Sequence, residues 1–246
     1  PSDAYKAVAD KAKEFLPSYM HHWMDRSVCK RTVMTIPYNA TKDSSRKYIR
    51  EALLEKKIDP TTDELTQIVN AVYQSMDTIV PGPMQVMRWI KKHVGLYIRN
   101  GAKEVQWVTP SGFIVNQRRD NIETKQMELQ LLGRTQVRLP TGKSTPSPTK
   151  HKSSTAPNYI HSFDASILHR SFTQFDEPFT VIHDSVLCRA GDMGTLNRLV
   201  RETYTNIFSE KCWLSEFAET INASEPPPIV GTLDPKVVSN STYFFC

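Results

Sequence analysis

Three residues near the N-terminus, Arg26, Lys30 and Tyr38, carry side chains that could bind a nucleotide. On a helix, a spacing of four residues puts Arg26 and Lys30 on one face, one turn apart, where their charges repel. A nucleoside triphosphate with its metal ion is a polyanion that would lie across both cations and relieve this repulsion. The tract therefore indicates nucleotide chemistry, although a charge pair taken alone is more often a solvated helix face.

A second candidate is the sequence from Val181 to Ser185, in which His183 and Asp184 stand between two apolar, β-prone runs. A carboxylate at a hairpin tip is rigidly held and accessible, and it suits a divalent metal that prefers oxygen ligands. Asp and Ser are also common turn residues, so the motif alone favours a simple turn. His161, taken alone, is more typical of a core or helix-capping histidine than of a site.

The end of the helix that carries Arg26 follows from local signals. Pro37 disfavours helical geometry at Ile36, so the helix should stop there and leave Tyr38 at its C-terminal end. Asn39 tolerates left-handed geometry and can close the helix.

Hydrophobic periodicity and turn residues predict the other elements. Helices are expected over residues 3–15 with Asp3 as the cap, over 43–98 with breaks near 59–60 and 80–83, over 159–173 and over 193–209. Strands are expected around a Pro-Ser-Gly turn from 105 to 115, in a long hairpin that pairs 113–118 with 129–139, and in a hairpin at 179–190. Residues 140–158 are rich in Pro, Ser, Thr and Lys, which predicts a loop.

Composition sets broad limits on function. The chain has 246 residues, 39% of them hydrophobic, which is enough for a buried core. Its formal charge of +5 mildly favours an anionic partner such as nucleic acid. Since no run of 18 apolar residues and no signal-like segment occurs, no membrane partner is expected, and we predict a cytoplasmic protein.

Taken together, these motifs resemble a known family. Arg26, Lys30 and Tyr38 are followed by Ala-Pro-Asn-Tyr-Ile-His-Ser-Phe-Asp at 156–164 and by Val-Ile-His-Asp-Ser at 181–185. In order and spacing they resemble the single-subunit DNA-directed RNA polymerases of bacteriophages and mitochondria. The resemblance covers nearly the whole chain, since Asp-Ala-Tyr, Trp-Val-Thr-Pro-x-Gly-Phe and the aromatic C-terminus agree as well. A phage-encoded polymerase of this kind would act in the bacterial host cell.

The resemblance implies an α+β fold with the helical fingers of a right-hand polymerase and part of its palm, an antiparallel hairpin with flanking helices. It implies four regions: fingers at 1–104 with a nucleotide-binding helix at 26–38, a promoter-reading β-hairpin arm and loop at 105–158, a palm helix and catalytic hairpin at 159–216, and a C-terminal tail at 217–246.

The resemblance also implies roles for single residues. The triphosphate would be bound by Arg26, Lys30 and Arg31. Selection of the ribose 2′-hydroxyl would fall to Tyr38 and His161, and Tyr5 would lie near the incoming nucleotide. The catalytic set would be Lys30, Tyr38, His183 and Asp184, and the candidate DNA contacts are Gln117, Arg118, Arg119 and Lys125.

Asp184 would bind the catalytic Mg²⁺ ions. Two-metal phosphoryl transfer needs further carboxylates, and Asp184 is the single one at a matching motif. The other palm aspartate, the thumb and the N-terminal domain of the family have no counterpart in these residues. We therefore expect a second polypeptide to supply them and the chain to act as one part of a heterodimeric nucleotidyltransferase.

The partners implied are a DNA template with its promoter, nascent RNA, nucleoside triphosphates and this second polypeptide. Two alternatives stay open. One is a DNA polymerase of the same superfamily, and the other is a non-catalytic nucleic-acid-binding subunit descended from a polymerase. The choice between ribonucleotides and deoxyribonucleotides separates the first alternative, and the effect of Asp184→Asn separates the second.

Overall fold

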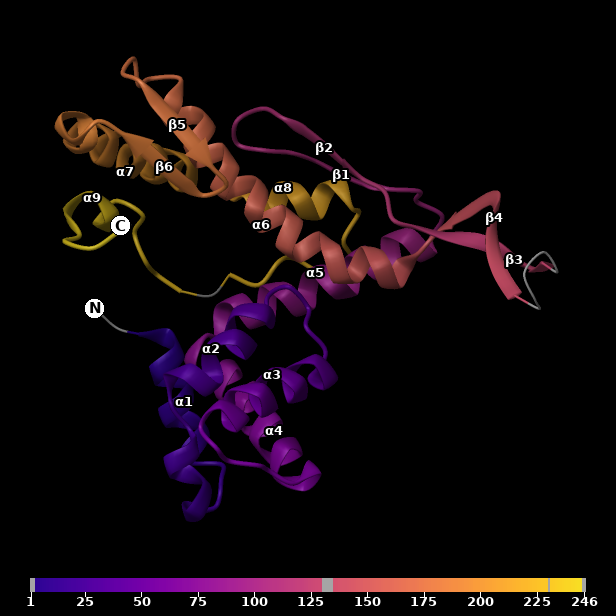
Figure 1. Cartoon of the computed structure of the whole chain (residues 1–246). Coiled ribbons are helices and arrows are strands. Elements are labelled where there is room, and N and C mark those ends of the chain that lie inside the picture. Colours follow the sequence, from indigo (N-terminus) through magenta and orange to yellow (C-terminus); the bar gives the residue numbers. More distant parts are fainter. Residues whose placement is uncertain (1–2, 130–134, 230, 245–246) are drawn as a thin grey trace. The chain divides into compact units, whose positions relative to one another are not determined.

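The computed structural model describes residues 3–129, 135–229 and 231–244. These residues form helices joined by small antiparallel hairpins, which confirms the predicted α+β class (Figure 1). Contacts divide the chain into a first unit, residues 1–89 with 227–246, and a second unit, residues 90–226.

The first unit is helical. It contains α1 (Ala4–Lys13), the 3₁₀ helix η1 (Ser18–Trp23), α2 (Arg26–Thr35), α3 (Lys42–Glu55), α4 (Thr62–Ile79), the start of α5 (Pro81–Arg99), and α9 (Val237–Asn240). Helix α1 packs against α2 and α4, and α3 packs against the same two helices. The first four α-helices each begin at a side chain that accepts backbone N–H groups of the first turn, namely Asp3, Asp25, Thr41 and Thr61. Such a cap contributes about 1 kcal/mol.

Helix α2 ends where the sequence predicted, but the stated reason is wrong, because Pro37 does not displace Ile36 from helical geometry. The helix ends at Thr35, and Ile36 follows as its C-cap with helical dihedral angles. Asn39 has a left-handed φ of 62° and its N–H donates to the Ile36 carbonyl at 2.9 Å. This closure leaves Tyr38 exposed just beyond the helix.

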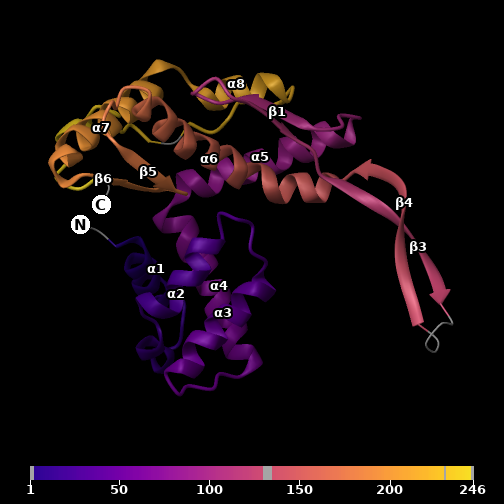
Figure 2. The same ribbon diagram turned by 45° about the horizontal axis from the view of Figure 1, so that its top comes forward.

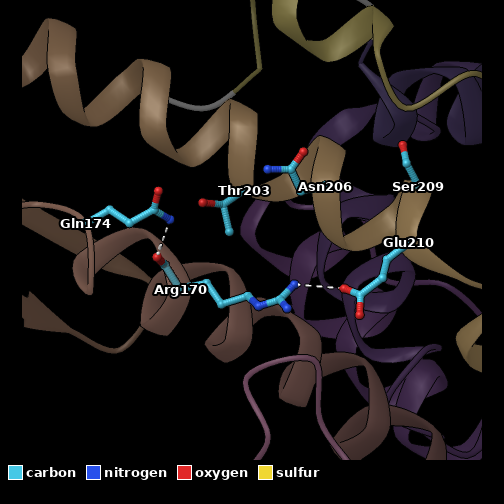
Figure 3. A pocket seen from close by; sticks show the side chains of 6 residues that line it. All are labelled: Arg170, Gln174, Thr203, Asn206, Ser209 and Glu210. Atoms are coloured by element: carbon cyan, nitrogen blue, oxygen red, sulfur yellow. Dashed lines mark hydrogen bonds and ion pairs between the residues drawn. The ribbon is translucent and has the colours of Figure 1, made fainter.

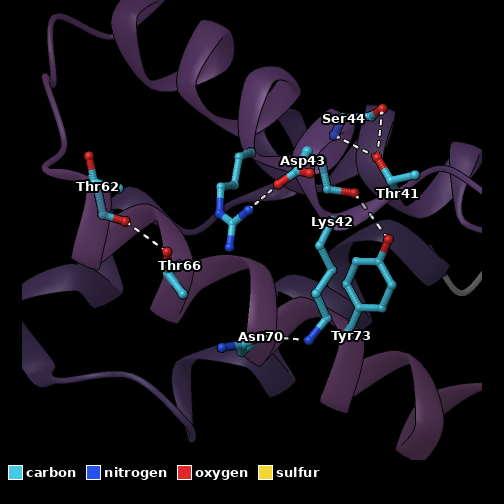
Figure 4. Close-up of polar contacts among 10 residues, drawn as sticks. Thr41, Lys42, Asp43, Ser44, Thr62, Thr66, Asn70 and Tyr73 are labelled. Carbon is cyan, nitrogen blue, oxygen red and sulfur yellow. Dashed lines mark hydrogen bonds and ion pairs between the residues drawn. The ribbon is translucent and has the colours of Figure 1, made fainter.

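Polar contacts join the segment after α2 to α3 and α4 (Figure 4). Tyr73 of α4 donates its hydroxyl to the Ala40 carbonyl at 2.9 Å, and the buried Ser45 hydroxyl lies 3.2 Å from the Tyr73 hydroxyl oxygen. The Lys42 ammonium donates to Asn70 at 2.7 Å. These bonds hold the end of α2 against the rest of its unit.

The second unit combines helices with hairpins. It contains the end of α5, β1 (Val105–Val108), β2 (Ile114–Gln117), β3 (Asp120–Leu129), β4 (Thr135–Pro146), α6 (Pro148–Phe172), β5 (Phe179–Ile182), β6 (Ser185–Cys188), η2 (Ala190–Asp192), α7 (Met193–Glu210) and α8 (Trp213–Thr220). In the described residues, the strands form three separate antiparallel pairs, β1–β2, β3–β4 and β5–β6. In two views, β3–β4 extends away from α6 (Figures 1 and 2).

Two predictions for this unit are wrong. Residues 113–118 do not pair with 129–139, because β2 pairs with β1, and β3 pairs with β4. Residues 140–158 are not a loop, because β4 runs to Pro146 and α6 begins at Pro148. The predicted loop rested on local composition, because a proline such as Pro157 removes one hydrogen bond from a helix that contains it. The structure nevertheless has a helix here, α6, and His151 and Thr155 are buried on it.

An aromatic cluster forms the core of the second unit. Tyr159 lies at the centre, with ring centroids 4.6 Å from Phe217, 5.0 Å from Phe163 and 5.8 Å from Trp107. The Tyr159 hydroxyl donates to the Trp213 carbonyl at 2.9 Å, so its buried polar end is satisfied. The cluster joins α6 to α8 and β1 and thereby fixes the helix that carries His161.

We predict that Phe217→Ala lowers the free energy of unfolding of the second unit by about 3–5 kcal/mol, because it leaves a cavity in this cluster. Urea unfolding followed by tryptophan fluorescence measures the loss. Phe113→Ala is the matched control, since Phe113 is 64% exposed, and it should change stability by about 0.5 kcal/mol or less. Equal effects of the two substitutions would contradict the assignment of this cluster as the core.

Candidate active site

Helix α2 exposes one face along its whole length. Arg26, Lys30 and Met34 follow one another at four-residue spacing and are exposed, and Tyr38, four residues further and 52% exposed, lies just beyond the helix. The opposite face is buried and consists of Val28, Cys29, Thr32 and Val33. The structure therefore places the predicted nucleotide-binding residues of this helix along one accessible line.

Two of the three cations on this face already have partners. Arg26 donates to Asp3 at 2.5 Å, and its guanidinium lies 5.4 Å from the Tyr5 ring centroid, so Tyr5 lies beside Arg26. Arg31 donates to Glu51 at 2.7 Å. Lys30 is exposed and has no hydrogen bond or ion pair with another described residue. Asp3, which the sequence indicated only as a cap, offsets the Arg26 charge before any ligand binds.

Asp25 holds the beginning of α2 in place. Its carboxylate accepts the Val28 N–H at 3.1 Å and the Ser27 hydroxyl at 2.7 Å, and it forms an ion pair with Lys56. Partial burial favours the neutral acid, but Lys56 and the two hydrogen bonds outweigh it and lower the pKa of Asp25 to about 2. The cap therefore stays charged and links the N-terminus of α2 to the residue that follows α3.

The second group of candidates lies at the β5–β6 hairpin. Ile182 pairs with Ser185, so His183 and Asp184 alone form its tip. His183 has a left-handed φ of 58°, which costs a residue with a Cβ atom about 1–2 kcal/mol. Such strain is retained where the surrounding structure fixes it, often at functional sites. Asp184 is exposed and has no hydrogen bond or ion pair with any described residue.

Helix α6 brings two further groups toward the hairpin. His161 is exposed on α6, and Asp164 follows three residues later, so the two side chains lie on the same face. Although the residue is partly exposed, desolvation of its carboxyl group raises the pKa of Asp164, His161 lowers it, and the negative charge of Asp184 raises it again. Asp164, which the sequence analysis left out of the site, thus lies within electrostatic range of both His161 and Asp184.

The predicted residues therefore fall into two groups. Those on α2, with Tyr5, belong to the first unit, whereas His161, His183 and Asp184 belong to the second. Each unit brings its own group together. The only sequence signal for Asp164 was its spacing of three residues from His161.

The candidate DNA contacts lie at the base of β3–β4 and along it. Arg118, Arg119 and Lys125 are exposed. Gln117 is 5% exposed, donates to Thr155 at 2.7 Å and accepts from Asn158 at 2.7 Å. Because both ends of its amide are bonded inside the unit, Gln117 supports the base of the β3–β4 hairpin.

A pocket of about 470 Å³ lies between α6 and α7, away from the predicted residues (Figure 3). Arg170 donates to Glu210 across it at 3.0 Å, and its lining also includes Gln174, Thr203, Asn206 and Ser209. Within the described ranges, no group of three or more His, Cys, Asp or Glu side chains could hold a metal ion. In the same ranges, none of the helices combines the length and the apolar composition that a membrane span needs.

We predict that Asp25→Asn flattens the acid limb of the stability curve. A lowered pKa adds stability that is complete above pH about 4, declines as the pH falls toward about 2, and is absent below. The Asp25 side chain is 51% exposed, so screening reduces this contribution to about 1 kcal/mol. Asn keeps the cap. Urea unfolding at pH 2 to 6 measures the effect, Asp59→Asn is the exposed control, and an unchanged acid limb in Asp25→Asn would refute the assignment.

Comparison with known proteins gives the family. The family model for DNA-dependent RNA polymerase matches residues 1–226. The chain is 26% identical over 233 residues to the DNA-directed RNA polymerase of Pseudomonas phage phiKMV, an alignment that covers 91% of this chain and 28% of that protein. It is 26% identical over 281 residues to the human mitochondrial DNA-directed RNA polymerase, covering 100% of this chain and 23% of that protein.

A third relative is T7 RNA polymerase of Escherichia phage T7, with 27% identity over 280 residues, 97% of this chain and 32% of that protein. The chain thus spans between 23% and 32% of the length of these three relatives. Because the family match covers most of the chain, this protein belongs to the DNA-dependent RNA polymerase family, in its phage and mitochondrial single-subunit branch.

Proposed function

We propose that these residues form the part of a DNA-directed RNA polymerase that binds the incoming nucleoside triphosphate and supplies one catalytic carboxylate. The observation that carries the proposal is Asp184, an exposed carboxylate at a two-residue hairpin tip that has no hydrogen bond or ion pair with any described residue. A group held in this way is accessible to a metal ion and to the end of a growing chain. The reaction is template-directed nucleotidyl transfer, in which pyrophosphate leaves.

Helix α2 binds the triphosphate in this proposal. Lys30, which has no other partner among the described residues, makes the first contact with the phosphates, and Arg26 joins it by exchanging Asp3 for a phosphate oxygen. Arg31 assists while it remains beside Glu51. Cations at this position offset the negative charge that develops on the leaving pyrophosphate.

Asp184 is one ligand of the magnesium site. Its carboxylate oxygens suit Mg²⁺, which, when bound, neutralises charge on the phosphates. One carboxylate does not hold two ions, and the described residues offer no larger group of ligands. We propose that a second polypeptide supplies the other aspartate, as a separate subunit or as the N-terminal piece of a cleaved polymerase. His183, in its strained conformation, shapes the turn that presents Asp184.

The exposed side chains of the β5–β6 hairpin also support a second polypeptide as partner. All four residues of β5 are exposed, and Phe179, Ile182 and Leu187 are 44%, 60% and 58% exposed. A two-stranded hairpin is marginally stable alone, and an unpaired apolar edge is a template for another strand. A partner that carries the second aspartate would add a strand here and bury these side chains.

Tyr38 and His161 select the sugar in this proposal, through contacts near the ribose 2′-hydroxyl. A site built to hydrogen-bond a hydroxyl discriminates strongly against the ligand that lacks it. The exposed Arg118, Arg119 and Lys125 contact the DNA through the arm, and a basic surface supplies mainly phosphate contacts.

We predict that Asp184→Asn in the assembled polymerase lowers RNA synthesis on a primed template by about a thousandfold or more, because it removes a metal ligand, and leaves template binding unchanged. Primer extension and a fluorescence binding assay measure the two quantities. Asp176→Asn, at another exposed acid that precedes the same hairpin, is the control. Full synthesis by Asp184→Asn would favour a non-catalytic nucleic-acid-binding subunit.

A second prediction concerns the sugar. Tyr38→Phe removes one hydroxyl and keeps the ring, so it should reduce the preference of the assembled enzyme for ribonucleotides by about tenfold or more while extension with ribonucleotides continues. Competition between ATP and dATP during single-nucleotide addition gives the ratio. Tyr48→Phe, on α3 against Arg31, is the control. A wild type that prefers deoxyribonucleotides would point to a DNA polymerase instead.

A further inference from the structure

The β3–β4 hairpin, called the arm here, is joined to α6 near its base, where Lys150 of α6 donates to the Asp120 carbonyl. Its outward residues are exposed, with Ile122, Met127 and Leu139 at 61%, 44% and 45%. Two views show it extending away from α6 (Figures 1 and 2). The direction of the arm therefore depends on the few contacts where β3 and β4 join the second unit.

Asp120, the first residue of β3, is the centre of these contacts. Its Oδ2 accepts from the Arg118 guanidinium at 2.9 Å and from the Ser144 hydroxyl at 2.8 Å, so it joins the link before β3 to β4. Its backbone carbonyl accepts from the Lys150 ammonium of α6 at 2.6 Å. The Asp120 side chain is only 15% exposed, and its Oδ1 is buried. One residue thus connects both strands of the arm to α6.

Backbone bonds complete the junction. The Ser147 N–H donates to the Arg119 carbonyl at 2.8 Å, and the Arg119 N–H donates to Nε2 of His151 at 3.2 Å. Because Nε2 of His151 accepts the Arg119 N–H, its Nδ1 is the atom that can donate to the Ser147 carbonyl, which lies 2.8 Å away. These bonds fix the ends of the arm, whereas the Asp120 side chain holds the two strands together beside them.

The arm also changes direction shortly beyond the junction. Ile122 pairs with Ser144, but Thr124 pairs with Pro140, so three residues of β4 lie opposite one of β3. Gly142, inside this bulge, has a φ of 81°. A bulge bends and twists the strand that contains it. A short paired base and a bulge therefore set the direction of the outer parts of β3 and β4, and any rotation of the base is transmitted along these two strands.

The length of the arm makes this rotation important. Ten residues of β3 span about 33 Å at roughly 3.3 Å each. A rotation of about 10° at the base then moves the outer end of β3 by about 6 Å, more than the roughly 3.4 Å between successive bases of a DNA strand.

We propose that Asp120 is a positioning residue that sets the direction of the arm and thereby determines which base step of duplex DNA the arm meets. The effect of Asp120 on the direction of the arm concerns this chain alone, whereas its effect on the choice of base step rests on the proposed function. Asp120 need not touch DNA itself. It acts through Arg118 and Ser144 on the direction of the arm, and Lys125, one of the proposed DNA contacts, lies beyond the bulge.

The first experiment measures the direction of the arm in the assembled polymerase. Spin labels at Met127→Cys and Ser153→Cys, with Cys188, Cys212 and Cys246 replaced by Ser, report the distance between the arm and α6 by pulsed electron double resonance. We expect one narrow distribution in the parent and a broader or shifted one in Asp120→Asn and Asp120→Ala. Ser144→Ala, which removes one bond, should give an intermediate result.

Lys143→Ala is the control. The Lys143 side chain is exposed in the bulge and forms no hydrogen bond or ion pair with another described residue. Circular dichroism verifies that each variant is folded. Distance distributions that are identical in the parent and all the Asp120 variants would overturn the positioning role of Asp120, whatever the arm binds.

The second experiment measures the choice of DNA. The enzymes transcribe a library of randomised duplexes, and sequencing of the RNA 5′ ends gives the start sites. We expect Asp120→Asn to reduce starts at the sites preferred by the parent by about fivefold or more, the loss of one base contact, while extension of an annealed RNA primer stays unchanged. Unaltered start sites in a variant with a displaced arm would overturn the link to DNA. A parent without any preferred sites would instead refute the proposed reading of DNA by the arm.

Discussion

The exposed position of Asp184, at the two-residue tip of the β5–β6 hairpin, is the constraint on which the rest of the proposed site depends. Desolvation raises the pKa of Asp164 on the neighbouring helix α6, His161 lowers it, and the negative charge of Asp184 raises it by less than His161 lowers it. A site that gathers negative charge on an exposed hairpin is stabilised by cations, whether metal ions or side chains of a bound protein. The same charge would make the site suitable for phosphoryl transfer, in which metal ions and cations meet the phosphates.

The two units divide the chemistry between them. The first holds α2 through its caps, through Asp25 and Lys56, and through Tyr73, so that a row of cations and Tyr38 is displayed on a fixed helix. The second holds α6 and the hairpin through an aromatic cluster around Tyr159. In the proposed polymerase, each unit supplies part of the groups for the reaction, and a second polypeptide supplies the further aspartate.

How much of this could be predicted from the sequence depends on how local the signal is. The end of α2 was predictable, because Asn39 acts through its own dihedral angles. The start of α6 was not, because Pro148, Pro157 and the Ser-Thr run favour a loop locally, while the burial of His151 and Thr155 depends on distant residues. The pairing of β3 with β4 was missed because a bulge breaks the alternation. Gln117 has the side chain of a DNA contact, and its burial is a tertiary property that no spacing reveals.

The measurement that tests the central claim most directly is primer extension by the purified 246-residue chain, with Mg²⁺, a primed template and all four ribonucleotides, alone and after addition of the proteins that copurify with it. We predict no extension by the chain alone, because in the proposed site Asp184 is one ligand of an incomplete metal site. We predict extension once a companion with the second aspartate is present. Template-directed synthesis by the chain alone would contradict the first of these predictions.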